Sequence, residues 1–138
     1  MKASKYLGQV REIKMRIDSL ERSIQRIDDL LLTAGVTDYT KERVMGGSSG
    51  NKTEDNIIKR QEYEEKLQLL CAKGIELLSD IIDRLADMDP LHAAILEMHY
   101  IGNLDFEDIA RELCYTVGYI YHKHNEAKKA FQEKYLKK

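Results

Sequence analysis

The chain has 138 residues, of which 33% are charged and 7% aromatic, with one proline and no tryptophan. This length allows one domain, or a small domain with an extension, and the residue balance favours long helices over a mixed sheet. The formal net charge of −2 excludes a general electrostatic attraction between the whole protein and nucleic acid. Cys71 and Cys114 are too few for a disulfide scaffold. No signal peptide and no apolar run of about 18 residues is visible, so we expect a cytoplasmic protein with no membrane partner.

Residues 1–35 carry the clearest periodicity in the sequence. Apolar residues recur at alternating spacings of four and three, which is the seam of a coiled coil. These residues are Tyr6, Val10, Ile13, Ile17, Leu20, Ile24, Ile27 and Leu31. Gly35 follows them as a helix stop. The pattern predicts a helix over about 3–34, and its apolar seam must meet another helix.

A second helix is predicted over about 53–87, with Thr53 as its N-cap. Its apolar stripe again has a spacing close to 3.5 and consists of Tyr63, Leu67, Leu70, Gly74, Leu77, Ile81 and Leu85. The two helices have similar lengths, so an antiparallel hairpin is the economical arrangement. The same seams also allow pairing between two chains, which would make a homodimer. The connection over about 36–52 exceeds the usual helix–helix length and is predicted to be a flexible linker.

A third helix begins at Asp89-Pro90. Aspartate is a favoured N-cap, and proline suits the first helical position, where its missing N–H has no cost. Apolar residues follow at helical spacing up to Met98, and Gly102 is predicted to close this helix.

Residues 104–127 read as two short helices joined by a tight turn. Asp105 is placed to cap the first helix, and Phe106, Ile109, Ala110 and Leu113 give it one apolar face. Cys114-Tyr115 makes the turn, and Thr116 is placed to cap the second helix. Ile120, Ala127 and Phe131 are predicted to face inward. This arrangement is typical of a helix-turn-helix, whose second helix enters a DNA major groove.

The second helix supplies the candidate DNA-binding residues. Residues 116–138 contain six lysines and two glutamates, a local charge of +4, so the basic charge lies on this helix and the tail. Tyr121 and His122 are the best equipped to contact DNA, Tyr121 at a phosphate or sugar and His122 at a purine edge, whereas Lys123, Lys128 and Lys129 would bind the backbone. The full predicted set is Thr116, Val117, Gly118, Tyr119, Tyr121, His122, Lys123, Asn125, Lys128 and Lys129.

The stretches DPLHAAILEMHYIG and DFEDIARELCYTVGYIYHKHNEA resemble the promoter-reading C-terminal domain of bacterial sigma factors. They look still more like a family of small phage proteins from Gram-positive hosts, some of which are ArpU-type late transcriptional regulators. The resemblance covers residues 89–131 most specifically and implies an all-α protein. Its parts would be a long antiparallel helical hairpin or coiled coil over 1–88 and a sigma-like helix-turn-helix domain over 89–138.

The function that this resemblance implies is transcriptional regulation by binding double-stranded DNA in the cytoplasm of a bacterial host cell. Host RNA polymerase would be a second partner. Two alternatives stay open: a protein–protein module that docks RNA polymerase or another phage protein, and a DNA-packaging adaptor. Sigma-like domains usually present Arg, Glu and Gln at the positions of Val117, Gly118 and His122, and Arg at Tyr121. Valine and glycine cannot make bidentate base contacts, so the resemblance does not carry over a base preference.

The sequence predicts no enzyme, no metal site and no cofactor. His122 and His124 are two apart on a helix and point in different directions, and no cysteine pair lies at zinc spacing. The stretch 46–53 resembles a phosphate-binding loop, but Asn51 occupies its second glycine position and no buried strand precedes it. No nucleophile–base arrangement is visible.

Overall fold

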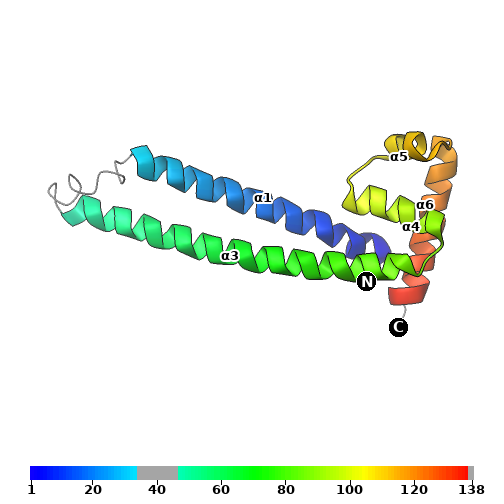
Figure 1. The fold of residues 1–138 in the computed structure, drawn as a ribbon, viewed down its shortest axis with the longest axis horizontal. Coiled ribbons are helices and arrows are strands. Elements are labelled where there is room, and N and C mark those ends of the chain that lie inside the picture. The colour runs from blue at the N-terminus through cyan, green and yellow to red at the C-terminus, as the bar shows by residue number, and fades with distance from the viewer. Residues whose placement is uncertain (34–46, 137–138) are drawn as a thin grey trace. The chain divides into compact units, whose positions relative to one another are not determined.

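The computed structural model describes residues 1–33 and 47–136, with side chains described outside 47–53. Every element in these ranges is helical, and they contain no strand, which confirms the all-α prediction. In chain order the elements are α1 (Ala3–Thr33), α3 (Gly47–Ala86), α4 (Pro90–Leu96), η1 (Glu97–Ile101), α5 (Phe106–Leu113), α6 (Val117–Phe131) and η2 (Gln132–Leu136). The two long helices run antiparallel, and shorter helices follow (Figure 1).

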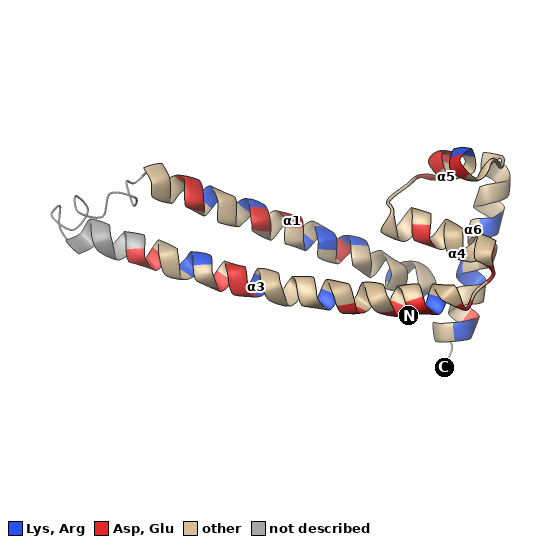
Figure 2. Ribbon diagram, in the orientation of Figure 1, with Lys and Arg blue, Asp and Glu red and all other residues tan. Residues whose placement is uncertain are grey.

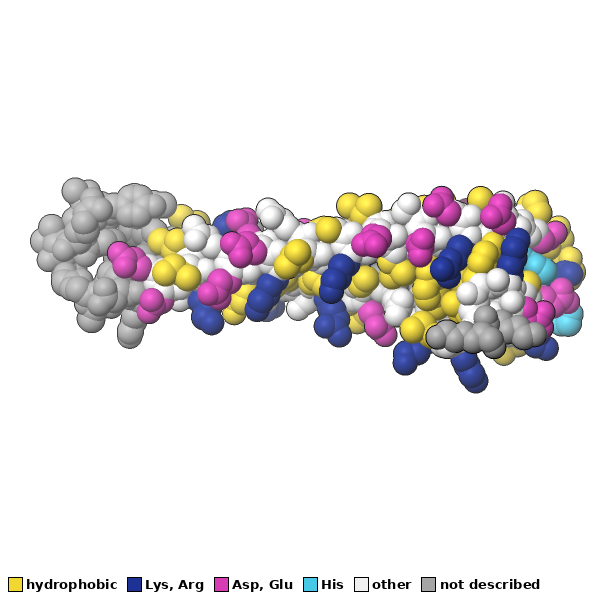
Figure 3. Space-filling view, turned by 90° about the horizontal axis from the view of Figure 1, so that it is seen from below, with side chains coloured by type: hydrophobic (Ala, Val, Ile, Leu, Met, Phe, Trp, Pro, Cys, Tyr) yellow, Lys and Arg dark blue, Asp and Glu magenta, His cyan; other side chains and the backbone are white. Residues whose placement is uncertain are grey.

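Residues 15–73 form one compact unit, which contains the facing parts of α1 and α3. All eight predicted seam residues of α1 are buried or half-buried, as are the seven of the α3 stripe. Lysine, arginine, aspartate and glutamate recur along both helices (Figure 2), and most of them are exposed. Hydrophobic side chains are nevertheless visible between the charged ones along these helices (Figure 3). The hairpin prediction is therefore confirmed: helix α1 extends from Ala3 to Thr33, and the predicted last residue, 34, lies outside the described residues.

The beginning of the second helix was predicted wrongly. Helix α3 starts at Gly47, six residues before Thr53, so Thr53 lies within the helix and is not its N-cap. Of the predicted linker 36–52, residues 47–52 are helical, while 36–46 and Gly35 lie outside the described residues. A cap-type residue inside a helical segment is indistinguishable from a helix start when only its neighbours are considered.

The second compact unit comprises residues 1–14 and 74–138. One core cluster joins the beginning of α1, the end of α3 and the C-terminal helices through Ala3, Leu7, Ile81, Leu85, Leu96, Ala127 and Phe131. A second cluster joins α4, α5 and α6 through Ile95, Ile109, Ala110 and Ile120. The predicted domain boundary at residue 88 therefore does not coincide with the boundaries of the compact units. The beginning of α1 and the end of α3 both belong to the second unit.

Local backbone chemistry defines the ends of α4 and η1. The Asp89 carboxylate accepts hydrogen bonds from the N–H groups of Leu91 and His92 at 3.2 and 3.3 Å, which confirms the predicted cap. Gly102 follows η1 as expected, but the left-handed residue is Asn103, with φ 58°. A Cβ on Gly102 would lie 2.8 Å from the Met98 carbonyl oxygen, so glycine is required there for a close approach.

Candidate nucleic-acid interface

Helix α5 and the three-residue connection after it fix the start of α6. Asp105 caps α5, since its Oδ1 accepts from the Asp108 N–H at 2.8 Å. Ile109 and Ala110 are buried on the inner face of α5. Cys114 then takes the left-handed conformation, with φ 62° and ψ 44°, and the next N–H donates back to the Ala110 carbonyl at 2.9 Å. This six-to-one bond is the closure of a Schellman cap, which turns the chain sharply out of α5.

Helix α6 begins with the predicted cap and buries the predicted face. The Thr116 Oγ1 accepts from the Tyr119 N–H at 3.2 Å. Ile120, Ala127 and Phe131 are fully buried, as the periodicity predicts, and His124 is buried beside them. In Figure 1, α6 crosses α4, and α5 lies over the first turns of α6. The N-terminal half of α6 is thus held from one side by α4 and α5.

The opposite side of that half is open to solvent. Val117, Tyr121 and His122 are exposed, with His122 keeping 72% of its side-chain surface. Gly118 is exposed too, and a Cβ there would meet nothing within 4 Å. The Tyr121 ring packs edge-on against Phe106 of α5, with 5.5 Å between ring centroids. This contact orients the exposed Tyr121 side chain.

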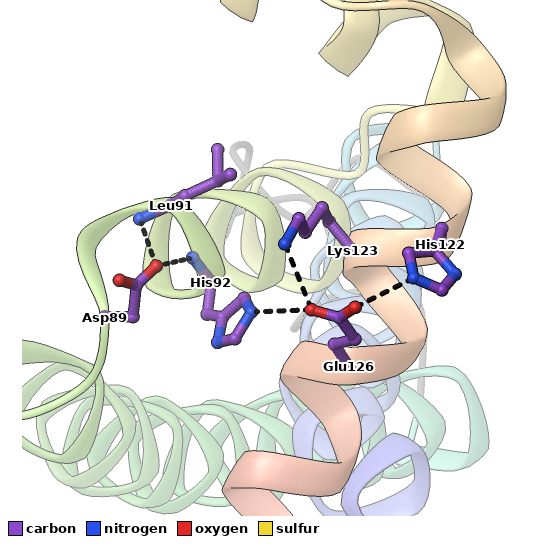
Figure 4. Close-up of polar contacts among 6 residues, drawn as sticks. All are labelled: Asp89, Leu91, His92, His122, Lys123 and Glu126. Carbon is purple, nitrogen blue, oxygen red and sulfur yellow. Dashed lines mark hydrogen bonds and ion pairs between the residues drawn. The ribbon is translucent and has the colours of Figure 1, made fainter.

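Glu126 connects three basic side chains on the flank of α6 (Figure 4). Its carboxylate oxygens lie 2.8 Å from His122 Nε2, 3.2 Å from Lys123 Nζ and 3.7 Å from His92 Nε2 of α4. The hydrogen bond from Lys123 holds the pKa of the Glu126 carboxyl below its usual value and raises the pKa of Lys123. Nε2 of His122 faces the Glu126 carboxylate and can donate to it, which leaves Nδ1 of a neutral ring as an acceptor.

The other predicted DNA-binding residues lie at the start of α6 and on its later turns. Thr116 and Tyr119 are exposed at the start of α6, where the Tyr119 ring lies against Tyr115 and Lys123. Asn125 is half-buried, Lys128 is half-buried and Lys129 is exposed on later turns of the same helix. In Figure 2, basic residues recur along α6, whereas α5 carries acidic and basic residues together. The predicted residues therefore share one helix, but Lys123 is engaged by Glu126 and is not a free cation.

An aromatic cluster behind α6 was not predicted from the sequence. His124 is 4% exposed, and its ring lies 4.8 Å from Phe106, 5.1 Å from His99 and 5.6 Å from Tyr100 between centroids. Its Nε2 is 3.1 Å from the Tyr100 hydroxyl, whereas no described group bonds to its buried Nδ1. Burial, followed by the charges of His99 and Lys128, lowers the pKa of His124 to about 4. The only feature of the sequence that indicates burial of His124 is its position four residues after Ile120.

No described residues form a group of three or more histidine, cysteine, aspartate or glutamate side chains able to hold a metal ion. Within the described ranges, no helix is long and apolar enough to cross a membrane. The chain matches no protein-family model, no curated protein and no solved structure.

Proposed function

We propose that the protein binds double-stranded DNA through α6 and acts as a transcriptional regulator. The observation that carries this proposal is the exposed N-terminal face of α6, supported from behind by α5 and α4. A short helix, a left-handed turn residue and a capped second helix with a solvent-facing start are the parts of a helix-turn-helix. Regulation, with RNA polymerase as a second partner, follows from the resemblance of residues 89–131 to sigma-factor promoter-reading domains.

The exposed residues give this helix a particular chemistry. Val117 and Gly118 let the backbone of α6 approach the base edges closely, and valine offers an apolar contact to a thymine methyl group. His122 would supply the polar contact, since its neutral ring presents Nδ1 to an amino group of adenine or cytosine. Tyr121 would bond a phosphate or pack on sugar. Specificity would therefore depend on few direct hydrogen bonds.

Selection of bound duplexes from a random pool tests the proposal directly. The expected result is a recurring sequence whose binding weakens steeply as salt rises, because lysine contacts to phosphate release counterions. His122→Ala should reduce the preference for that sequence over a scrambled duplex by about 1–3 kcal/mol. Gln61→Ala, an exposed substitution on α3, serves as the matched control and should change neither affinity nor preference. A protein that binds no duplex at 50 mM salt would contradict DNA binding.

A further inference from the structure

A basic groove lies between the beginning of α1 and the second half of α6. Its volume is about 430 Å³, and its lining consists of Lys2, Ala3, Ser4, Lys128, Lys129, Gln132 and Glu133. Three lysines and one glutamate give it a formal charge of +2 (3 − 1). All of these residues belong to the same compact unit.

The walls of this groove are held together by direct contacts. Gln132 Oε1 accepts from the Ala3 N–H at 2.6 Å, and Gln132 Nε2 donates to the Met1 carbonyl at 2.9 Å. Ala3 is buried beside them, and Leu7 and Phe131 are fully buried in the adjoining core. The backbone positions that carry the lysines are therefore fixed before any ligand binds, which reduces the entropy cost of binding.

The groove continues the exposed face of α6. Residues three and four apart lie on the same side of a helix, so Gly118, Tyr121, Asn125, Lys128 and Gln132 follow one another along one stripe. From Tyr121 to Lys128 the stripe rises by about 10 Å along the helix axis. Phosphates repeat along a DNA strand, so a strand contacted by Tyr121 can present another phosphate to Lys128 in the groove.

The groove also differs from the flank of α6 that carries Lys123. On that flank Glu126 already forms an ion pair with Lys123, whereas the first turn of α1 contains no acidic residue. Glu133 is the one carboxylate among the lining residues, which include three lysines. Among the described residues, an incoming phosphate thus adds a favourable charge without displacing an ion pair of these lysines.

We infer that this groove binds a phosphate of the DNA backbone, which makes the beginning of α1 part of the DNA interface. The inference rests on the proposed function and extends it beyond α5 and α6. Lys2, Lys128 and Lys129 are the donors, and they bind without reading sequence because every nucleotide carries the same phosphate. This phosphate contact would set the position of α6 along the DNA major groove.

Lys2→Asp tests the inference without weakening the fold. The Lys2 carbonyl accepts the first helical bond, from the Tyr6 N–H at 3.0 Å, so Lys2 is the N-cap of α1. Aspartate is a favoured N-cap, and helicity and melting temperature should be unchanged or higher. Affinity for the selected duplex should fall about tenfold at 0.15 M salt, and the salt dependence should flatten by about one phosphate contact. The preference for the selected over a scrambled duplex should stay the same.

Arg11→Asp is the matched control, since Arg11 is exposed, does not line the groove and lies nine residues, about 13 Å, further along α1. It makes the same charge change, and at 0.15 M salt a charge acts over only about 8 Å. A loss in the Lys2 variant that Arg11→Asp does not reproduce supports the inference. Equal losses, or full affinity in Lys2→Asp, overturn the phosphate site while DNA binding stands. Absence of duplex binding by the wild type overturns both proposals together.

Discussion

Cys114 has a backbone conformation that glycine adopts more easily than any other residue. Its φ of 62° and ψ of 44° place its Cβ close to the following carbonyl oxygen, at a cost of about 1–2 kcal/mol. The side chain is exposed, so replacing it removes no buried contact. We therefore expect Cys114→Gly to raise the free energy of unfolding by about 1 kcal/mol, measured by urea denaturation. Cys114→Ala removes the thiol but keeps the strain, so equal stabilisation by both variants would contradict this explanation.

Glu126 contacts basic side chains that the proposed function would offer to DNA. Its carboxylate contacts His122, Lys123 and His92, and it also adds a negative charge beside the face proposed to approach phosphates. If α6 binds DNA, Glu126→Gln should tighten binding to all duplexes severalfold and increase the number of counterions released by about one. Filter binding or fluorescence anisotropy over a salt series measures both quantities.

The control for Glu126→Gln is Glu97→Gln, which makes the same charge change at an exposed position in η1. It should alter affinity much less, because exposed charges are screened beyond about 8 Å at 0.15 M salt. Weaker DNA binding by Glu126→Gln would contradict this prediction. It would show that the Glu126 carboxylate favours DNA binding by orienting His122.

At the scale of elements, the contact between α6 and η1 depends on keeping His124 neutral. Its Nε2 bonds the Tyr100 hydroxyl, and a proton on its buried Nδ1 would have no partner among the described residues. The folded pKa is about 4, below the ordinary value of 6.5, so between these values the unfolded chain binds more protons. Stability from this group is therefore present above pH 6.5 and is lost as the pH falls toward 4.

This linkage predicts that the wild type loses about 2 kcal/mol through His124 between pH 7 and pH 4.5. In His124→Phe, which keeps an aromatic ring beside Phe106, the drop in unfolding free energy over this range should be smaller by that amount. Equal pH dependence in the two proteins, measured by urea denaturation, would show that His124 does not carry the linkage.

The elements that the sequence predicted correctly are those with local causes. Asp89, Asp105 and Thr116 cap the helices that follow them, because an N-cap bonds only to residues two or three positions ahead. The long apolar periods of α1 and α3 likewise predicted their paired faces. The start of α3 was missed because Gly47 and its neighbours have compositions typical of linkers.

The parts that were not predicted depend on tertiary contacts. Burial of His124 requires Tyr100 and Phe106 from other elements, and its histidine neighbour at 122 is exposed at almost the same sequence distance from them. The Glu126 contact with His92 joins residues 34 positions apart (126 − 92). Helical periodicity identified the outer face of α6, but it contains no information on which charged side chains neutralise one another there.

At the scale of the molecule, residues 15–73 present an incompletely buried apolar seam. Two helices can cover only one face of each other, and among the described side chains of this unit only Ile24 is fully enclosed in the seam. Leu30 and Leu69 are 66% and 67% exposed. A groove of about 470 Å³ runs beside the seam, where Leu20, Leu69 and Leu70 lie among basic side chains. Exposed apolar surface of this kind is stabilised when a second helical pair covers it.

We therefore expect the protein to dimerise through the hairpin, which would also supply two copies of α6 for half-sites one DNA turn apart. Sedimentation at micromolar concentration should give twice the chain mass of 16.0 kDa. Leu69→Glu should restore the single-chain mass without loss of helicity, because Leu69 makes little contact within its own chain. Ile75→Glu is equally exposed, about a third of a turn around α3 from Leu69, and should leave the dimer intact. A wild type that sediments at the single-chain mass would mean that each hairpin is complete alone, and DNA half-sites would then have to be read by independent copies.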